Sequence, residues 1–487
     1  MQGWADSVSF NQKTVTVEES VVDNRGGGLQ SGPDPYRHGS LTDMKNEKFG
    51  KRREGKRFEV GYDKLVVAVG CYSQTFGTKG VNENAYFMKD VGDARRIRKR
   101  VLECFEMASL PTTSPQLRER LLNFAIIGGG PTGMEFAAEL SDLIQVDLSH
   151  IYPRLVPLAR IAVHDVAPKV LSMFDEKLTQ YAMKNFNRAG IKIKTKSHIE
   201  ELRRGVPKTN GSVSDEEVAD AQGCYTLTTR EEGEQGIGMC VWATGNKMNP
   251  FVKSALRKTR RFPVRSALLS PGAQSPTELP TQDWMLEKDA RTGAIVVDDR
   301  LHARMVSQTT TPAPNPDEDE QPASRAVLAD VYALGDVSCL ASGPVPATAQ
   351  VADQQARYLA KVFNALPPLP PPSPYPTPHA SPSGTSTVQP TTTTNLASYA
   401  AFPVAVSTSP SQAVSPLIAV PPSQQVPPFK FKNAGIMAYV GNSKAIFNPP
   451  NKEAPDISGR AAWLIWRGAY MAKSISWRNR ILIPTYW

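Results

Sequence analysis

Three glycines, Gly128, Gly130 and Gly133, have the G-x-G-x-x-G spacing of a turn that binds a dinucleotide. An apolar run, residues 124–127, precedes them, and residues 134–140 have the pattern of a helix. Such glycines let the backbone approach a pyrophosphate closely, at the positive N-terminus of the helix. The motif alone is a weak signal, and a turn that only packs a helix is the alternative. The strand before it and the helix after it favour the nucleotide site.

Asp165 is the candidate ligand of the nucleotide ribose, because it lies at the end of the second predicted strand, within residues 159–168. The usual spacing from the last glycine to this acid is about 20 residues. Here the interval is longer, so we expect the intervening helix to be lengthened. An acid without an adjacent arginine favours NADH over NADPH.

Two further strands end in small residues that let backbone close over a cofactor. One strand, within residues 239–251, ends at Ala243-Thr244-Gly245, and another, within residues 64–74, ends at Gly70. Each strand end is uninformative alone. Together with the glycine turn they indicate two dinucleotide sites in two lobes.

A third strand ends at Gly335-Asp336, where one carboxylate can bind the ribityl hydroxyls of a flavin. Residues 346–363 follow as a predicted helix. Its positive N-terminus would stabilise negative charge on the pyrimidine end of a reduced flavin. The alternative is that Asp336 only caps this helix.

The cysteines and the basic clusters exclude other kinds of site. No C-x-x-C pair occurs among the five cysteines, which argues against a zinc site, a disulfide scaffold and a redox dithiol, and we predict no metal site. The net charge of +9 arises mostly from local clusters such as residues 95–100, which have the spacing of the solvated side of an amphipathic helix. No nucleic-acid partner is therefore predicted. No apolar run is long enough for a transmembrane helix.

Six ordered segments together resemble the type II (alternative, non-proton-pumping) NADH:ubiquinone oxidoreductases of mitochondria. The segments are FAIIGGGPTGMEFAAEL, VWATGN, YALGDV, AQVADQQARYLA, GIMAYVGNSKAI and RNRILIP. The resemblance runs from about residue 7 to residue 487, apart from polar inserts and a Pro-rich tract. It implies FAD and NAD as cofactors, NADH and ubiquinone as substrates, and the surface of the mitochondrial inner membrane as the location. A homodimer is a further expectation.

The resemblance also implies roles for individual residues. Glu135 would lie near the contact between nicotinamide and flavin and handle charge or a proton. Gln350 and Gln354, in the A-Q-x-x-x-Q pattern that begins at Ala349, would line the quinone end of the flavin. Gly335 and Asp336 match the flavin-binding pair.

The predicted fold is α/β, with two Rossmann-like dinucleotide-binding domains and a small C-terminal domain. The NADH lobe is expected to be intact and the FAD lobe incomplete, because residues 1–60 contain no first strand with its own glycine turn. The chain thus looks truncated at both ends relative to the family. The expected units are a remnant of the FAD-binding domain (1–120), the NADH-binding domain (121–290), the second part of the FAD-binding domain (291–364), a disordered Pro/Ser/Thr-rich linker (365–428) and a membrane-associating C-terminal domain (429–487).

Three functions stay open at this point. The first is an NADH:ubiquinone reductase that uses FAD. The second is a degenerate relative that binds NADH without flavin or turnover. The third is another two-domain FAD/NAD(P) reductase. For the aromatic helix within residues 460–477, contact with a membrane interface and packing in the C-terminal core are both open.

Overall fold

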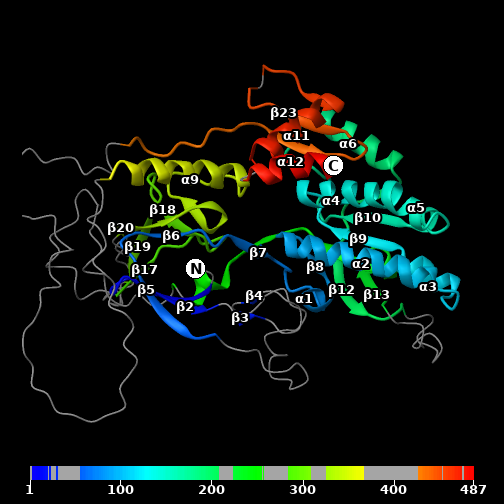
Figure 1. Ribbon diagram of the computed structural model, residues 1–487, viewed down its shortest axis with the longest axis horizontal. Coiled ribbons are helices and arrows are strands. Elements are labelled where there is room, and N and C mark those ends of the chain that lie inside the picture. The colour runs from blue at the N-terminus through cyan, green and yellow to red at the C-terminus, as the bar shows by residue number, and fades with distance from the viewer. Residues whose placement is uncertain are drawn as a thin grey trace, which may run out of the picture.

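The structure is a computed structural model that describes residues 3–19, 21–22, 29–30, 55–207, 223–254, 256, 283–308, 325–366, 426–451, 453–473 and 476–486. The predicted linker at 365–428 lies almost entirely outside these residues. The described chain forms two α/β lobes and a C-terminal domain (Figure 1). We call the lobes the glycine-turn lobe and the Asp336 lobe, after the motifs that they carry.

A five-stranded parallel sheet forms the centre of the glycine-turn lobe, in the order β11-β10-β9-β15-β8. These strands are β8 (Tyr86–Phe87), β9 (Asn123–Ile127), β10 (Arg160–His164), β11 (Ile191–Lys194) and β15 (Met239–Trp242). Both faces of the central strands are covered, so they consist of nearly continuous apolar residues. The antiparallel strands β12 (Ile199–Arg204), β13 (Tyr225–Thr229) and β14 (Gly233–Ile237) form a meander against this sheet.

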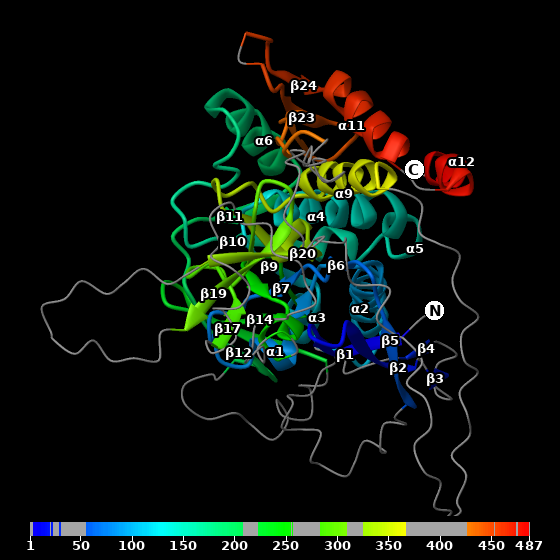
Figure 2. The ribbon, with the colours of Figure 1, turned by 90° about the vertical axis from the view of Figure 1, so that its left-hand side faces the viewer.

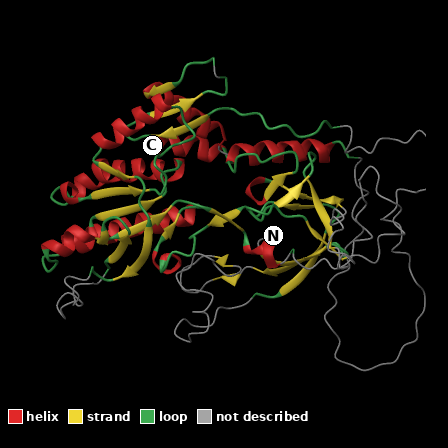
Figure 3. Cartoon of the chain, turned by 180° about the vertical axis from the view of Figure 1, so that it is seen from behind, coloured by secondary structure: helices red, strands yellow, loops and turns green. Residues whose placement is uncertain are grey.

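Helices cover the sheet, and strand and helix layers alternate through this lobe (Figure 3). They are α1 (Val81–Asn84), α2 (Val91–Ser109), α3 (Pro115–Leu121), α4 (Pro131–Asp142), α5 (Ser149–Ile151) and α6 (Glu176–Arg188). Asp90 starts α2 with a capping box, and Ser114 caps α3 just before a proline at its first position. After α4, a π-helical segment (Leu143–Leu148) continues into α5. This extension confirms the expected lengthening between the glycine turn and β10.

The basic segment 95–100 lies on the solvated side of α2 as expected, with one exception. Arg95, Arg96, Arg98 and Lys99 are exposed, whereas Arg100 is buried. Its guanidinium donates to the Gly238 carbonyl oxygen at 2.8 and 3.0 Å and lies 5.5 Å from the centre of the Tyr225 ring. Arg100 therefore fastens α2 to the meander. Helical spacing alone could not indicate this, because the acceptor lies far along the chain.

The Asp336 lobe has a mixed sheet in the order β21-β18-β19-β20-β6, with β17 paired to β19. Its strands are β6 (Leu65–Val67), β17 (Asp283–Leu286), β18 (Ile295–Val297), β19 (His302–Gln308), β20 (Arg325–Ala333) and β21 (Ser338–Leu340). The helix α9 (Ala349–Asn364) packs beside it. Beyond this lobe's sheet lie β1 (Gly3–Ser9), β2 (Thr14–Glu19) and β5 (Arg57–Gly61), the pair β3 (Val21–Val22) and β4 (Leu29–Gln30), and the helix α8 (Pro250–Ser254). Among the described residues β6 is the last strand of its sheet, as the predicted incomplete FAD lobe requires.

Two crossover strands join the lobes, β7 (Cys71–Ser73) and β16 (Asn246–Met248), which pair antiparallel. The structure places β8 and α2 on the glycine-turn sheet, although both lie within residues 1–120. It also pairs β17 with β19, although β17 lies within residues 121–290. These placements favour lobe boundaries at the two crossovers. The domain boundaries stay a prediction.

The C-terminal domain lies over α4 and α6 (Figures 1 and 2). It contains the antiparallel sheet β22 (Ile436–Tyr439), β23 (Ala445–Asn448) and β24 (Ile457–Gly459), followed by α11 (Arg460–Lys473) and α12 (Trp477–Tyr486). Ala438, Ile446 and Trp466 belong to the same buried cluster as α4. The domain is therefore packed onto the glycine-turn lobe rather than tethered to it. No helix within the described ranges is long and apolar enough to cross a membrane.

Candidate dinucleotide and electron-transfer site

The glycine turn joins β9 to α4 and has the shape that its sequence predicts. Gly128 has a φ of 122°, which favours glycine, and a side chain there would contact the Ala243 carbonyl oxygen at 2.9 Å. At Gly133 a Cβ would come within 2.0 Å of the Gly128 carbonyl oxygen, so only glycine fits. No atom lies within 4 Å of a Cβ placed on Gly130. The turn is closed on its inner side and open at Gly130.

Asp165 follows β10 directly and supports this turn. One carboxylate oxygen accepts a hydrogen bond from the Gly129 amide, and the other accepts one from the Ala167 amide at 2.7 Å. The Leu171 amide in turn donates to the Gly129 carbonyl oxygen at 2.9 Å. Asp165 therefore lies against the turn, where an acid that binds the ribose must lie.

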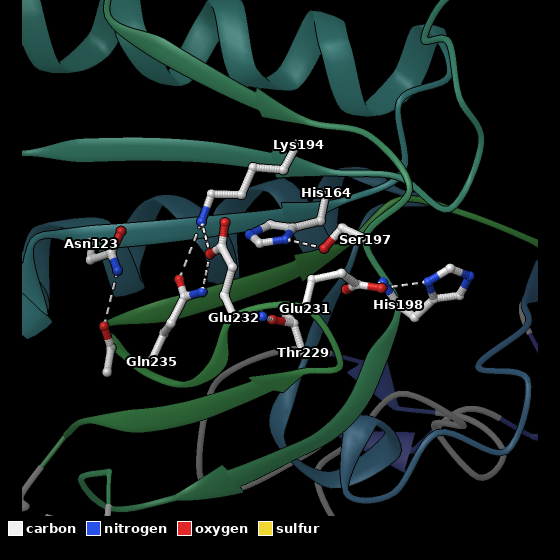
Figure 4. Close-up of polar contacts among 10 residues, drawn as sticks. Asn123, His164, Lys194, Ser197, His198, Thr229, Glu231, Glu232 and Gln235 are labelled. Carbon is white, nitrogen blue, oxygen red and sulfur yellow. Dashed lines mark hydrogen bonds and ion pairs between the residues drawn. The ribbon is translucent and has the colours of Figure 1, made fainter.

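Polar contacts, buried at His164 and Ser197 and exposed at Glu232, surround the strand end that carries Asp165 (Figure 4). His164, only 1% exposed, has its Nδ1 2.9 Å from Ser197 Oγ. Lys194, at the end of β11, contacts Glu232 and Gln235 of the meander. Burial, followed by the nearby charge of Lys194, lowers the pKa of His164 to about 4. The imidazole is thus neutral at physiological pH.

The ends of β15 and β6 lie where the lobes meet. The Ala243 amide donates to the Ile127 carbonyl oxygen at 2.8 Å, which holds the end of β15 beside the glycine turn. Gly245, with a φ of 73°, packs so closely that a Cβ would lie 2.8 Å from the Phe76 ring. Gly70 also has a positive φ, 65°, but open space around it. The structure therefore brings Ala243 to the nucleotide turn and places Gly70 and Gly245 at the crossovers.

Asp336 is joined to the crossovers by a residue that the sequence did not single out. The thiol of Cys71 donates to the Asp336 carboxylate at 3.2 Å. Lys89 contacts Cys71 at 3.7 Å and donates to Asn246 Oδ1 at 2.8 Å. Burial is the main cause that raises the pKa of the Cys71 thiol to about 11, so the group is a neutral donor. In the sequence, only the strand end at Gly70 was informative here, and nothing indicated that Cys71 contacts Asp336.

The start of α9 is capped by Thr348, whose Oγ1 accepts from the Val351 amide. Ala349 is thus the first helical residue. Asp336 is not this cap, which removes the alternative proposed for it. Gln355, fully buried, accepts from the Gly335 amide at 2.7 Å, while its Nε2 has no partner among the described residues.

The two glutamines predicted to line the quinone end contact a different part of the chain. Gln350 accepts from the Ala434 amide at 3.1 Å and donates to the Gly435 carbonyl oxygen at 3.3 Å. Gln354 accepts from and donates to the backbone of Lys432, at 3.0 and 2.8 Å. Both amides therefore fasten α9 to the segment that enters the C-terminal domain. Their role toward quinone stays a prediction.

Glu135 lies in the first turns of α4 and is held by the C-terminal domain. Its Oε1 accepts from the Tyr439 amide at 2.9 Å and from the Trp466 indole nitrogen at 3.3 Å. Burial raises its pKa, and these two hydrogen bonds partly offset that effect. The sequence indicated Glu135 but not its partners.

The residues fit a dinucleotide at the glycine turn. The N-terminus of α4 has no side-chain cap, so its backbone amides are free for a pyrophosphate. For a flavin, Asp336 and the start of α9 fit the ribityl and pyrimidine end, and the unpaired Nε2 of Gln355 is a buried donor next to Gly335. The described residues contain no second glycine turn between a parallel strand and a helix for the flavin pyrophosphate. No group of side chains that could hold a metal ion occurs in the described parts of the chain.

Comparison with protein families matches two regions. Residues 36–356 match the model of the pyridine nucleotide-disulphide oxidoreductases, and residues 434–487 match the NDH2 C-terminal domain. The first match covers the glycine turn, Asp165 and Asp336, and the second covers both partners of Glu135.

Individual relatives agree with the family models. A protein named probable NADH dehydrogenase from Dictyostelium discoideum is 31% identical over 435 residues, which are 89% of this chain and 68% of that protein. The external alternative NADH-ubiquinone oxidoreductase of Yarrowia lipolytica is 29% identical over 88% of this chain and 61% of its own length. The solved structure of NDH2 from Plasmodium falciparum in complex with NADH has the same fold, with a TM-score of 0.60 at 17% identity, and covers 100% of this chain and 84% of its own. The chain therefore belongs to the pyridine nucleotide-disulphide oxidoreductase family, among the members that carry an NDH2 C-terminal domain.

Proposed function

We propose that the protein is a non-electrogenic NADH:ubiquinone reductase that passes two electrons from NADH through FAD to ubiquinone. One observation carries the proposal. Glu135, two residues after the last glycine of the nucleotide turn, is held by Tyr439 and Trp466 of the C-terminal domain. This contact joins the nucleotide site to the domain that marks NDH2 proteins. The names of the relatives from Dictyostelium and Yarrowia support the same reaction.

NADH binds at the glycine turn. The free amides at the start of α4 hold the pyrophosphate, and the open space at Gly130 lets the phosphates approach. Asp165 accepts from the ribose hydroxyls and at the same time keeps the turn in place through Gly129. The nicotinamide end then points toward the crossovers between the lobes.

Bound FAD supplies the chemistry of accepting a hydride and releasing its two electrons to the quinone. Asp336 would bind the ribityl hydroxyls, with Cys71 as a neutral donor that orients its carboxylate. The positive N-terminus of α9 would stabilise negative charge on the flavin. Burial raises the pKa of Glu135, which favours a proton on its carboxyl group. Gln350 and Gln354 border the side at which the quinone arrives.

The C-terminal helices provide the surface that meets the membrane. Large apolar side chains are exposed on α11 and α12, at Leu464, Tyr470, Trp477 and Ile481. Arg467 and Arg480 lie 5.0 Å from the Trp463 and Trp477 rings. Aromatic and apolar residues among cations are typical of helices that lie in a membrane interface. Relatives whose names include the word mitochondrial support a mitochondrial location. We further propose that the protein lies on the inner membrane and forms a homodimer.

A second candidate is a relative that binds NADH without flavin turnover. This second candidate is favoured by the Asp336 lobe, in which β6 is the last described strand of the sheet. A flavin pyrophosphate needs a further strand with a glycine turn, which the described residues lack. The two candidates differ in one observable property, the visible spectrum of the protein.

The test is an absorption spectrum of the purified chain, incubated with FAD and desalted, before and after anaerobic NADH. The reductase predicts flavin bands that NADH bleaches and that ubiquinone restores. A colourless protein that binds NADH supports the second candidate. Retained flavin that NADH does not bleach would rule out both.

A further inference from the structure

The two oxygens of the Glu135 carboxyl group have different hydrogen-bond partners, and this difference affects where a proton binds. The Tyr439 amide and the Trp466 indole N–H both bind the same oxygen, Oε1. A carboxylic acid carries its proton on one oxygen, and an oxygen that accepts two N–H groups is the poorer place for it. The contacts therefore select Oε2 as the oxygen that carries a proton.

Trp466 is fixed firmly enough to keep this selection. It is 8% exposed, its ring stacks on Tyr439 with centroids 5.3 Å apart, and it lies tilted by 45° against Tyr470 with centroids 4.7 Å apart. Two aromatic neighbours therefore restrain the indole. Its N–H cannot leave Glu135 without disturbing these ring contacts.

Reduction of ubiquinone, the reaction of the proposed function, needs a proton in addition to the hydride from NADH. NADH gives up two electrons and one proton as a hydride, whereas a quinone takes up two electrons and two protons to become a quinol. One proton per turnover must therefore come from solvent. Glu135 is the half-buried carboxyl group between the nucleotide turn and the C-terminal domain.

We propose that Trp466 is a positioning residue for this proton, because its indole N–H and the Tyr439 amide bind Glu135 Oε1 and leave Oε2 to carry it. The use of this proton in quinone reduction rests on the proposed function. The contact between Trp466 and Glu135 is independent of that function. Trp466 sets how tightly Glu135 holds the proton, and the C-terminal domain thereby acts on the nucleotide lobe.

The other groups around Glu135 act in a known direction. Glu139 and Asp142 lie one and two turns further along α4, Tyr439 is on β22 and Tyr470 is on α11. Burial, followed by the charges of Asp142 and Glu135, raises the pKa of Glu139 to about 7. Negative charge on either acid favours the protonated form of Glu135. The two N–H donors oppose it, which keeps Glu135 able to release its proton.

The test is Trp466→Phe, which keeps a ring between Tyr439 and Tyr470 and removes the N–H. Without this donor the pKa of Glu135 should rise by about one pH unit, because a hydrogen bond to the charged form is lost. The alkaline limb of the pH profile for ubiquinone reduction, where Glu135 loses its proton, should move to higher pH by the same amount. The dissociation constant of NADH should stay unchanged. Trp463→Phe, on the same helix and three residues earlier, is the matched control and should move neither quantity.

A second readout does not depend on turnover. Carbon NMR of chain labelled at the glutamate carboxyl groups follows the titration of Glu135 without any cofactor, and Glu135→Gln assigns its signal. A shift in Trp466→Phe and none in Trp463→Phe supports the proposal. An unmoved Glu135 titration in a folded Trp466→Phe protein overturns it. If ubiquinone is not reduced at all, the proposed function fails, and the NMR titration still decides the role of Trp466.

Discussion

At Gly130 a substitution should affect nucleotide binding without affecting folding. Its φ of −75° suits any residue, and no atom lies within 4 Å of the place of a Cβ. Gly130→Asp should therefore fold normally but place a carboxylate against the NADH pyrophosphate. We expect the dissociation constant of NADH to rise by at least about tenfold, measured by calorimetric titration. Gly130→Ala, which adds bulk without charge, should bind NADH much better than the aspartate variant; equal losses would contradict an anion at this site.

Asp165 should decide which nicotinamide nucleotide binds. Asp165→Ser removes the acceptor for the ribose hydroxyls and the repulsion toward a phosphate on the ribose. The ratio of kcat/KM for NADH to that for NADPH should fall by about tenfold or more. Asp165→Asn keeps one oxygen for the Gly129 and Ala167 amides and separates the loss of charge from the loss of support. An unchanged ratio in the serine variant would show that another residue reads the ribose.

At this scale the sequence indicated the geometry of the glycine turn better than the contacts that support it. Gly128, Gly133 and Asp165 lie together as predicted, because the turn depends on local spacing, and their roles as ligands stay a prediction. The partners of Glu135 were not, because Tyr439 and Trp466 lie 304 and 331 residues further along the chain. Gln350 and Gln354 were found by resemblance, yet their contacts with residues 432–435 follow only from packing.

At the scale of elements, the end of β10 carries a built-in sensitivity to acid. His164 is buried, and its pKa is lowered from 6.5 to about 4. Between these pH values the unfolded chain takes up a proton that the folded chain does not. Stability is therefore full above pH 6.5 and falls as the pH drops toward 4, by about 3 kcal/mol at most from this group.

His164→Gln replaces the imidazole beside Ser197 with an amide, which can still form a hydrogen bond but does not titrate in this pH range. The loss of unfolding free energy between pH 7 and pH 5, measured with urea, should be smaller in this variant than in the parent protein. His150→Gln, at an exposed position on α5, is the control. The same pH dependence in the parent protein and His164→Gln would refute the role of the buried imidazole.

The elements beside the glycine turn could be predicted from the sequence to within a few residues, because the apolar run and the glycines mark them locally. The predicted run 124–127 lies in β9, and the predicted helix 134–140 lies in α4, which begins at the proline after Gly130. The short β8 could not be predicted, since two residues, Tyr86–Phe87, give no period. It becomes a strand only because β15 offers an open edge.

For the whole molecule, the surface of α12 gives a test of membrane contact. Ile481 is 65% exposed and lies one turn after Trp477, which is 76% exposed. Ile481→Glu should weaken co-sedimentation with vesicles of anionic phospholipid by several-fold, because it puts a negative charge beside the exposed Trp477. Val146→Glu, at an equally exposed apolar position in the glycine-turn lobe, should leave sedimentation unchanged. Equal effects at both positions would mean that no particular face meets the lipid.

The presence of two lobes was predictable from the repeated strand ends, but the positions of the boundaries between them were not. Residues before 120 were assigned to the lobe of Asp336, whereas α2 and β8 pack with the glycine turn. Composition does not reveal this, because both lobes use the same apolar strands. The pairing of β7 with β16 fixes it.

That pairing has a consequence for how the molecule can be divided. The chain enters the glycine-turn lobe at Ser73 and leaves it at Asn246, and these two residues are direct neighbours on paired strands. The lobe is thus an insertion whose two ends meet, so a cut through one crossover alone leaves the halves joined by the other. A short loop could close the ends of the excised lobe. Such a piece would keep the glycine turn but would expose the part of α4 that packs with Ala438, Ile446 and Trp466 in the whole protein.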